Sequence, residues 1–155
     1  MCIRDRTMSW GKFFVTTAGL LVFLWLMFCY VYGIFVLNDT IVPYPGTEID
    51  EWLNGYYISG LISGLLGFIC SAVWFSIGNS YDGRSSLGIK FGIIWIVSIV
   101  FSVAVKFLVM PDFVEGAGLA SVFIILLAPL LYYLSSLFAP ANASKYIPPL
   151  SGLIH

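Results

Sequence analysis

The chain alternates between long apolar segments and short polar ones. Four of the apolar segments reach the roughly 20 residues that an α-helix needs to cross about 30 Å of hydrocarbon. They are Phe13–Leu37, Gly55–Ile77, Ile89–Met110 and Ala117–Phe138. The strict apolar/polar alternation of membrane β-strands is absent. The pattern therefore predicts an all-α integral membrane protein, a bundle of four transmembrane helices with short loops.

The composition agrees with a chain that lies mostly in lipid. Of its 155 residues, 60% are hydrophobic and only 10% are charged, whereas about a quarter of the residues in a soluble domain are charged. The formal net charge is −1 and no basic patch is present. We therefore expect the lipid bilayer as a partner, and no nucleic acid.

The distribution of lysine and arginine predicts the orientation in the membrane, because these residues are enriched in cytoplasmic loops. With the N-terminus inside, Lys12, Arg84, Lys90 and Lys145 fall on the cytoplasmic side, and Lys106 falls near the outer surface. The prediction is that both termini lie inside. This charge order and the lack of a trafficking signal favour a bacterial cytoplasmic (inner) membrane.

Residues 8–138 are expected to form a single transmembrane domain. Residues 1–7, MCIRDRT, are interpreted as a non-native leader, and no function is assigned to them. Residues 139–155 contain three prolines. Because proline does not continue a helix, this segment is expected to form an extended cytoplasmic tail.

A stripe of small residues marks the second apolar segment. Gly60, Gly64, Gly67 and Ser71 recur at intervals of four, three and four residues, which places them on one side of a helix. Small residues let two membrane helices approach closely. The stripe is predicted to be a packing seam inside the bundle; an interface with another chain and a substrate path are the alternatives.

The third segment carries the only ionisable side chain expected within the hydrocarbon, Lys106. Together with Ser98 and Ser102 it recurs at every fourth residue and forms a polar face. One hypothesis is that this face lines a pathway for an anion or a lipid headgroup. The alternative is that the long side chain reaches the membrane surface, or pairs with Asp112 or Glu115.

Pro129 lies near the middle of the fourth segment. Because proline has no backbone N–H, it is expected to release the carbonyl of Ile125 and to kink the helix.

Residues for catalysis or cofactor binding are scarce in the four segments. The single histidine is the terminal His155, and the segments contain no aspartate or glutamate in their central parts. Cys29 and Cys70 are predicted to lie near opposite membrane surfaces and to remain unpaired. We therefore expect no enzyme and no catalytic, cofactor-binding or metal site.

Two functional hypotheses follow from this sequence. The first is a non-catalytic subunit or assembly factor of a larger membrane complex, with other membrane subunits as partners. The second is a small channel or transporter formed by several copies of the chain, with the polar face of the third segment along its pathway.

Overall fold

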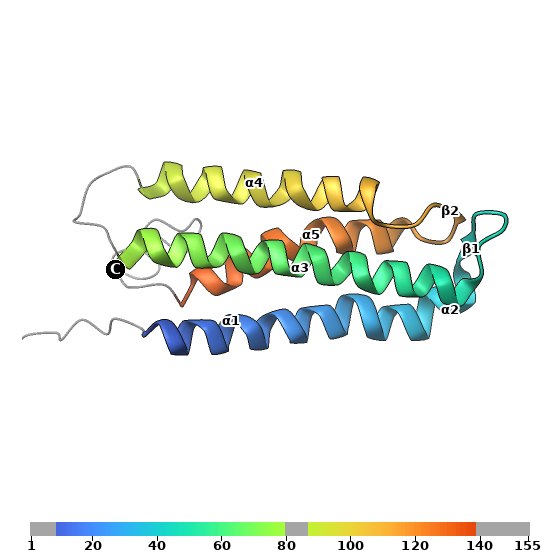
Figure 1. The fold of residues 1–155 in the computed structure, drawn as a ribbon, viewed down its shortest axis with the longest axis horizontal. Helices are drawn as coiled ribbons and strands as arrows, with labels where there is room; N and C mark the ends of the chain where they lie inside the picture. Colours follow the sequence, from blue (N-terminus) through green and yellow to red (C-terminus); the bar gives the residue numbers. More distant parts are fainter. Residues whose placement is uncertain (1–8, 80–86, 139–155) are drawn as a thin grey trace, which may run out of the picture.

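The computed structural model of the protein describes residues 9–79 and 87–138, and it consists mainly of four long helices that lie side by side (Figure 1). Each is long and apolar enough to cross a membrane, which confirms the all-α prediction with four helices of spanning length. The first runs from Trp10 to Thr40, and the others are α3 (Ile49–Asn79), α4 (Leu87–Leu108) and α5 (Gly118–Ser136). The predicted leader and tail, with Arg84 and Lys145, lie outside the described residues.

The helices α3 and α5 form the centre of the bundle, and the first helix and α4 flank them (Figure 1). Within the most apolar 18 residues of each helix, 44% of the residues are buried in α3 and in α5, against 22% in the first helix and in α4. The first helix and α4 therefore present most of their apolar surface outward.

The first helix widens in its second half. It begins as α1 (Trp10–Trp25), continues through the π-helical segments η1 (Leu26–Val31) and η2 (Gly33–Leu37), and ends in α2 (Asn38–Thr40). A π-helix has i→i+5 hydrogen bonds and is frequently found at functional sites. The apolar pattern of this segment does not predict the change.

The wide turns keep one set of side chains against α3 and α5. Leu24, Cys29, Gly33 and Leu37 are buried at intervals of five, four and four residues. A regular α-helix with about 3.6 residues per turn would rotate such positions progressively away from one face. The segment is also bonded to α3, because the Tyr56 hydroxyl donates to the backbone carbonyl of Phe28 over 2.7 Å.

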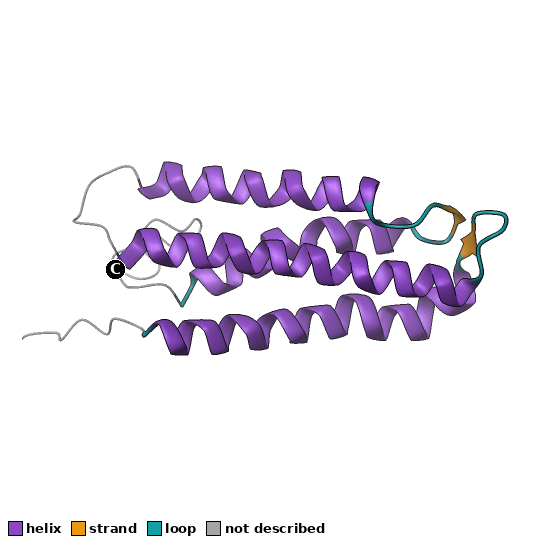
Figure 2. Cartoon of the chain, in the orientation of Figure 1, coloured by secondary structure: helices purple, strands orange, loops and turns teal. Residues whose placement is uncertain are grey.

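The two loops at one end of the bundle are joined by a short antiparallel pair of strands, β1 (Val42–Pro43) and β2 (Phe113–Glu115) (Figure 2). The indole N–H of Trp52 in α3 donates to the carbonyl of Asp112 over 3.1 Å. Gly116 packs directly on the backbone of Thr40 with φ of +88°, a conformation that favours glycine. These contacts tie the end of the first helix to the start of α5.

Candidate functional site

The four small residues of the predicted seam are all buried within this chain. A Cβ atom added at Gly60 would meet the Sγ atom of Cys29 and the indole of Trp25 in the first helix. The Ser71 hydroxyl accepts a hydrogen bond of 2.6 Å from Ser135 of α5. The stripe therefore faces the first helix at one end and α5 at the other.

The closest approach along the seam is between Gly67 and Ala128. A Cβ atom added at Gly67 would lie 2.8 Å from both the Cα and the carbonyl oxygen of Ala128, which are backbone atoms. At Gly64 the neighbours are side-chain atoms at ordinary contact distance, Leu21 Cγ at 3.4 Å and Leu127 Cδ2 at 3.6 Å. The crossing of α3 and α5 therefore requires glycine at position 67 more than at position 64.

These contacts favour the packing interpretation of the seam over the two alternatives. The first helix and α5 cover the small residues, so the stripe itself presents no surface to a second chain. An interface with another protein has to be sought on a different face of the bundle.

Gly67→Ala is expected to destabilise the bundle by roughly 1–3 kcal/mol, because the new methyl group meets backbone atoms that cannot move aside. Gly64→Ala is the matched control: its methyl group meets only side-chain atoms at ordinary contact distance, and alanine is favoured over glycine in a helix by up to about 1 kcal/mol, so this variant should be no less stable than the wild type. Unfolding of the purified protein in mixed detergent micelles measures both. Equal losses in the two variants would contradict the assignment of Gly67 as the point of closest approach.

Several serine hydroxyls in the centre of the bundle are hydrogen-bonded within it. Ser63 donates to the carbonyl of Ile124 over 2.8 Å, and its oxygen lies 3.2 Å from that of Ser102. Because Ser63 has one hydroxyl hydrogen, Ser102 is the donor in their contact. Ser98 is fully buried and donates to the carbonyl of Trp95 in its own helix. Ser63 and Ser102 therefore connect α3, α4 and α5, and all three serines face the interior.

The surroundings of Lys106 differ from those of Ser98 and Ser102. Its side chain is half-buried at the end of α4, and its ammonium group sits 4.1 Å from the centre of the Phe107 ring and 5.9 Å from that of Phe113. In the described part of the chain it makes no ion pair with Asp112 or Glu115. The structure thus brings Ser102 to Ser63 and leaves Lys106 among aromatic rings at the bundle end.

Ser63→Ala is expected to destabilise the bundle by about 1 kcal/mol, because one substitution removes its bonds to two other helices. Ser59→Ala is a matched control, since Ser59 is equally buried but bonds only to the carbonyl of Gly55 in its own helix. The same unfolding measurement compares them. A control variant as unstable as Ser63→Ala would show that the bonds between helices contribute no specific stability.

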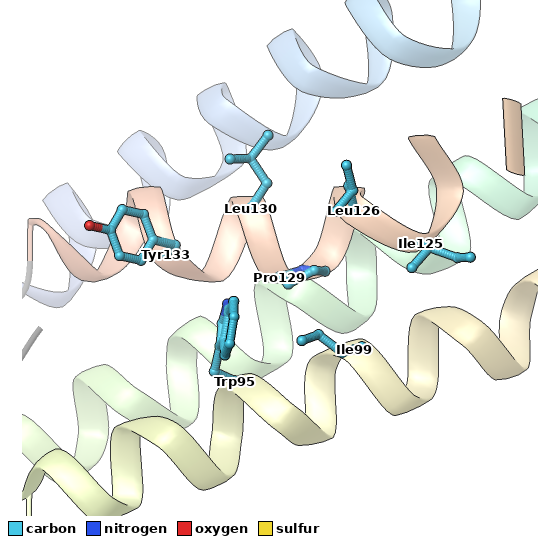
Figure 3. A pocket seen from close by; sticks show the side chains of 7 residues that line it. All are labelled: Trp95, Ile99, Ile125, Leu126, Pro129, Leu130 and Tyr133. Atoms are coloured by element: carbon cyan, nitrogen blue, oxygen red, sulfur yellow. The ribbon is translucent and has the colours of Figure 1, made fainter. Parts of the chain in front are cut away.

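A cavity of about 340 Å³ lies between α4 and α5 beside Pro129 (Figure 3). The helix α5 continues through this proline, whose side chain is buried. Trp95 and Ile99 project from α4 toward Pro129. All lining atoms are apolar, and the lining residues are Trp95, Ile99, Ile125, Leu126, Pro129, Leu130 and Tyr133. Sequence reasoning identified the proline but gave no sign of the cavity.

Charged groups in the described part of the chain lie near the ends of the helices. Lys12 and Lys90 lie near the starts of α1 and α4, Asp39 lies at the end of the first helix, and Asp50 and Glu51 belong to the first turn of α3. No group of three or more His, Cys, Asp or Glu side chains that could hold a metal ion occurs among the described residues. Cys29 and Cys70 are free thiols.

Comparison of the chain with protein-family models, with curated proteins and with solved structures finds no match.

Proposed function

We propose that this protein is a multi-pass membrane protein that acts as a non-catalytic subunit or assembly factor of a larger membrane complex. The observation that carries the proposal is a contrast between interior and surface. The interior is filled mainly by apolar side chains and by serine hydroxyls that are hydrogen-bonded within the bundle, whereas α4 presents an open face with two glycines. Such a molecule is suited to packing against another protein in the membrane.

The proposed location is a bacterial inner membrane, with the N-terminus and the C-terminus of the chain on the cytoplasmic side. The first helix and α4 begin at one end of the bundle, where α3 and α5 finish (Figure 1). Lys12 and Lys90 therefore lie at this end, and Asp50, Glu51 and Lys106 lie at the other. The positive-inside rule supports placing the end with Lys12 and Lys90 in the cytoplasm.

The proposed docking face is the side of α4 that carries Gly88 and Gly92. A Cβ atom added at either glycine would meet nothing within 4 Å. Trp95 and Ile99 follow on the same face, because the four positions are separated by four, three and four residues. These two side chains also line the cavity at Pro129.

A transmembrane helix of another subunit is the occupant that this face suits best. The glycines allow its backbone to come close, as in small-xxx-small helix pairs. One of its bulky side chains would fill the cavity beside Pro129, as an anchor residue fills a pocket in other interfaces.

The alternative, a channel or transporter made of several copies, draws less support from the geometry. The hydroxyls of Ser98 and Ser102 are buried and bonded within one bundle, and the ammonium group of Lys106 is held over Phe107. A second copy could nevertheless dock on the same glycine face. Ion flux through the purified protein in vesicles distinguishes this alternative from an inert subunit.

The proposed orientation predicts which engineered cysteines react from outside. In a variant without Cys2, Glu115→Cys should be labelled in intact cells by a maleimide that does not cross membranes. Ser9→Cys should be labelled only after the cells are permeabilised. Both positions are exposed on the bundle and lie at opposite ends of it, so the reverse pattern would contradict the orientation.

Gly92→Leu should lower the recovery of the partner in mild-detergent copurification from native membranes about tenfold, because a bulky side chain separates the two helices. Gly19→Leu is the matched control, since Gly19 lies within α1 and also has open space around it. Its partner recovery should match the wild type. Unchanged recovery with Gly92→Leu would exclude this face as the docking surface, and flux through the isolated protein would favour the channel.

A further inference from the structure

Besides the cavity at Pro129, an apolar groove of about 220 Å³ lies on the outside of the bundle between α3 and α4. Ile69, Val73, Val97 and Phe101 on its rims are exposed. The residues that line it are Leu66, Ile69, Cys70, Val73, Ile94, Val97 and Phe101. This groove is on the opposite side of α4 from the docking face, because its α4 residues each follow Gly92, Trp95 or Ile99 by two residues, a rotation of about 200° at 3.6 residues per turn.

The two rims end in polar side chains at the same end of the bundle. On α4, Lys90 precedes Ile94, Val97 and Phe101 at intervals of four, three and four residues, so all share one face. On α3, Ser76 follows Ile69 and Val73 at intervals of four and three residues. Lys90 and Ser76 are both exposed, and they lie where α4 begins and α3 ends.

The surface of the groove therefore changes from apolar to hydrogen-bond donating along its length. Lys90 lies about 10 Å along the helix axis from Val97, at roughly 1.5 Å per residue. This distance is most of one membrane leaflet, whose hydrocarbon is about 15 Å deep. An acyl chain in the groove would place its headgroup beside the lysine and the serine.

The shape of the groove favours a lipid over a helix. Its lining contains no glycine, and its rims carry branched and aromatic side chains. These side chains keep a helix backbone at a distance, whereas a single hydrocarbon chain fits between them. The occupant suggested by the rims is therefore thin and apolar, with a negatively charged end.

We propose that the α3/α4 groove is a binding site for an anionic phospholipid of the cytoplasmic leaflet, with one acyl chain between the two helices and the phosphate at Lys90 and Ser76. The proposal rests on the membrane orientation proposed above. That orientation places Lys90 at the leaflet surface where anionic lipids concentrate and where basic sites between helices bind their headgroups. An ammonium group binds phosphate as a compact positive charge.

Photocrosslinking of the full-length protein tests this site. The protein is reconstituted in vesicles of phosphatidylcholine that contain a trace of phosphatidylglycerol with a photoreactive acyl chain, and the labelled peptides are mapped. Labelling is expected at Ile69, Val73, Val97 and Phe101. It should exceed the labelling by the same probe with a choline headgroup about fivefold, the effect of one lysine near the membrane surface.

Three variants separate the contributions of headgroup and chain. Lys90→Gln should abolish the preference for the anionic probe, and Lys12→Gln, which removes the same charge from the same end, should retain it. Val97→Trp should fill the groove and lower the labelling of α3 by both probes. A preference that survives Lys90→Gln, an equal loss in both lysine variants, or unchanged labelling in Val97→Trp would overturn the proposal.

A separate measurement distinguishes failure of this site from failure of the proposed membrane function. An alkaline carbonate wash of the vesicles should leave the protein in the membrane. Release by the wash would contradict membrane insertion itself. Retention together with labelling spread evenly over all outward-facing residues would overturn the groove alone.

Discussion

The close approach of α3 and α5 at Gly67 and Ala128 is the constraint on which the rest of the bundle depends. The two helices run in the same direction, and polar contacts flank the crossing on both sides. Ser63 bonds to the Ile124 carbonyl before it, and Ser71 bonds to Ser135 after it. These bonds need helices that nearly touch, which only small residues at the crossing allow. The first helix and α4 then pack against the surfaces of this central pair.

Sequence reasoning predicted the four helices because segment length and apolar content decide them. It also placed Gly60, Gly64, Gly67 and Ser71 on one side, because helix periodicity requires it, but periodicity does not reveal which helix each residue meets. The π-helical turns could not be predicted. Almost every residue around Cys29 is apolar, so no contrast between apolar and polar positions marks which side of the helix is buried. The spacing of Ser98, Ser102 and Lys106 likewise predicted a shared polar face, but spacing alone does not reveal that the lysine side chain turns toward Phe107.

The outward surface of α4 divides into two regions with different packing properties. Gly88 and Gly92 leave a flat strip along which another helix can lie. Val97 and Phe101 form the rim of a narrow groove that ends at Lys90. A single helix can therefore contact a protein on one side and a lipid on the other, because side-chain size changes around its circumference.

The wide turns of the first helix also shorten a helix that is long and apolar enough to cross a membrane. A regular α-helix of the 31 residues from Trp10 to Thr40 would be roughly 46 Å long, well beyond a hydrocarbon core of about 30 Å. Turns that contain more residues advance less along the axis for each residue. In a bilayer, the winding of this helix would therefore relieve part of the hydrophobic mismatch, with less need for tilt or for local thickening of the membrane.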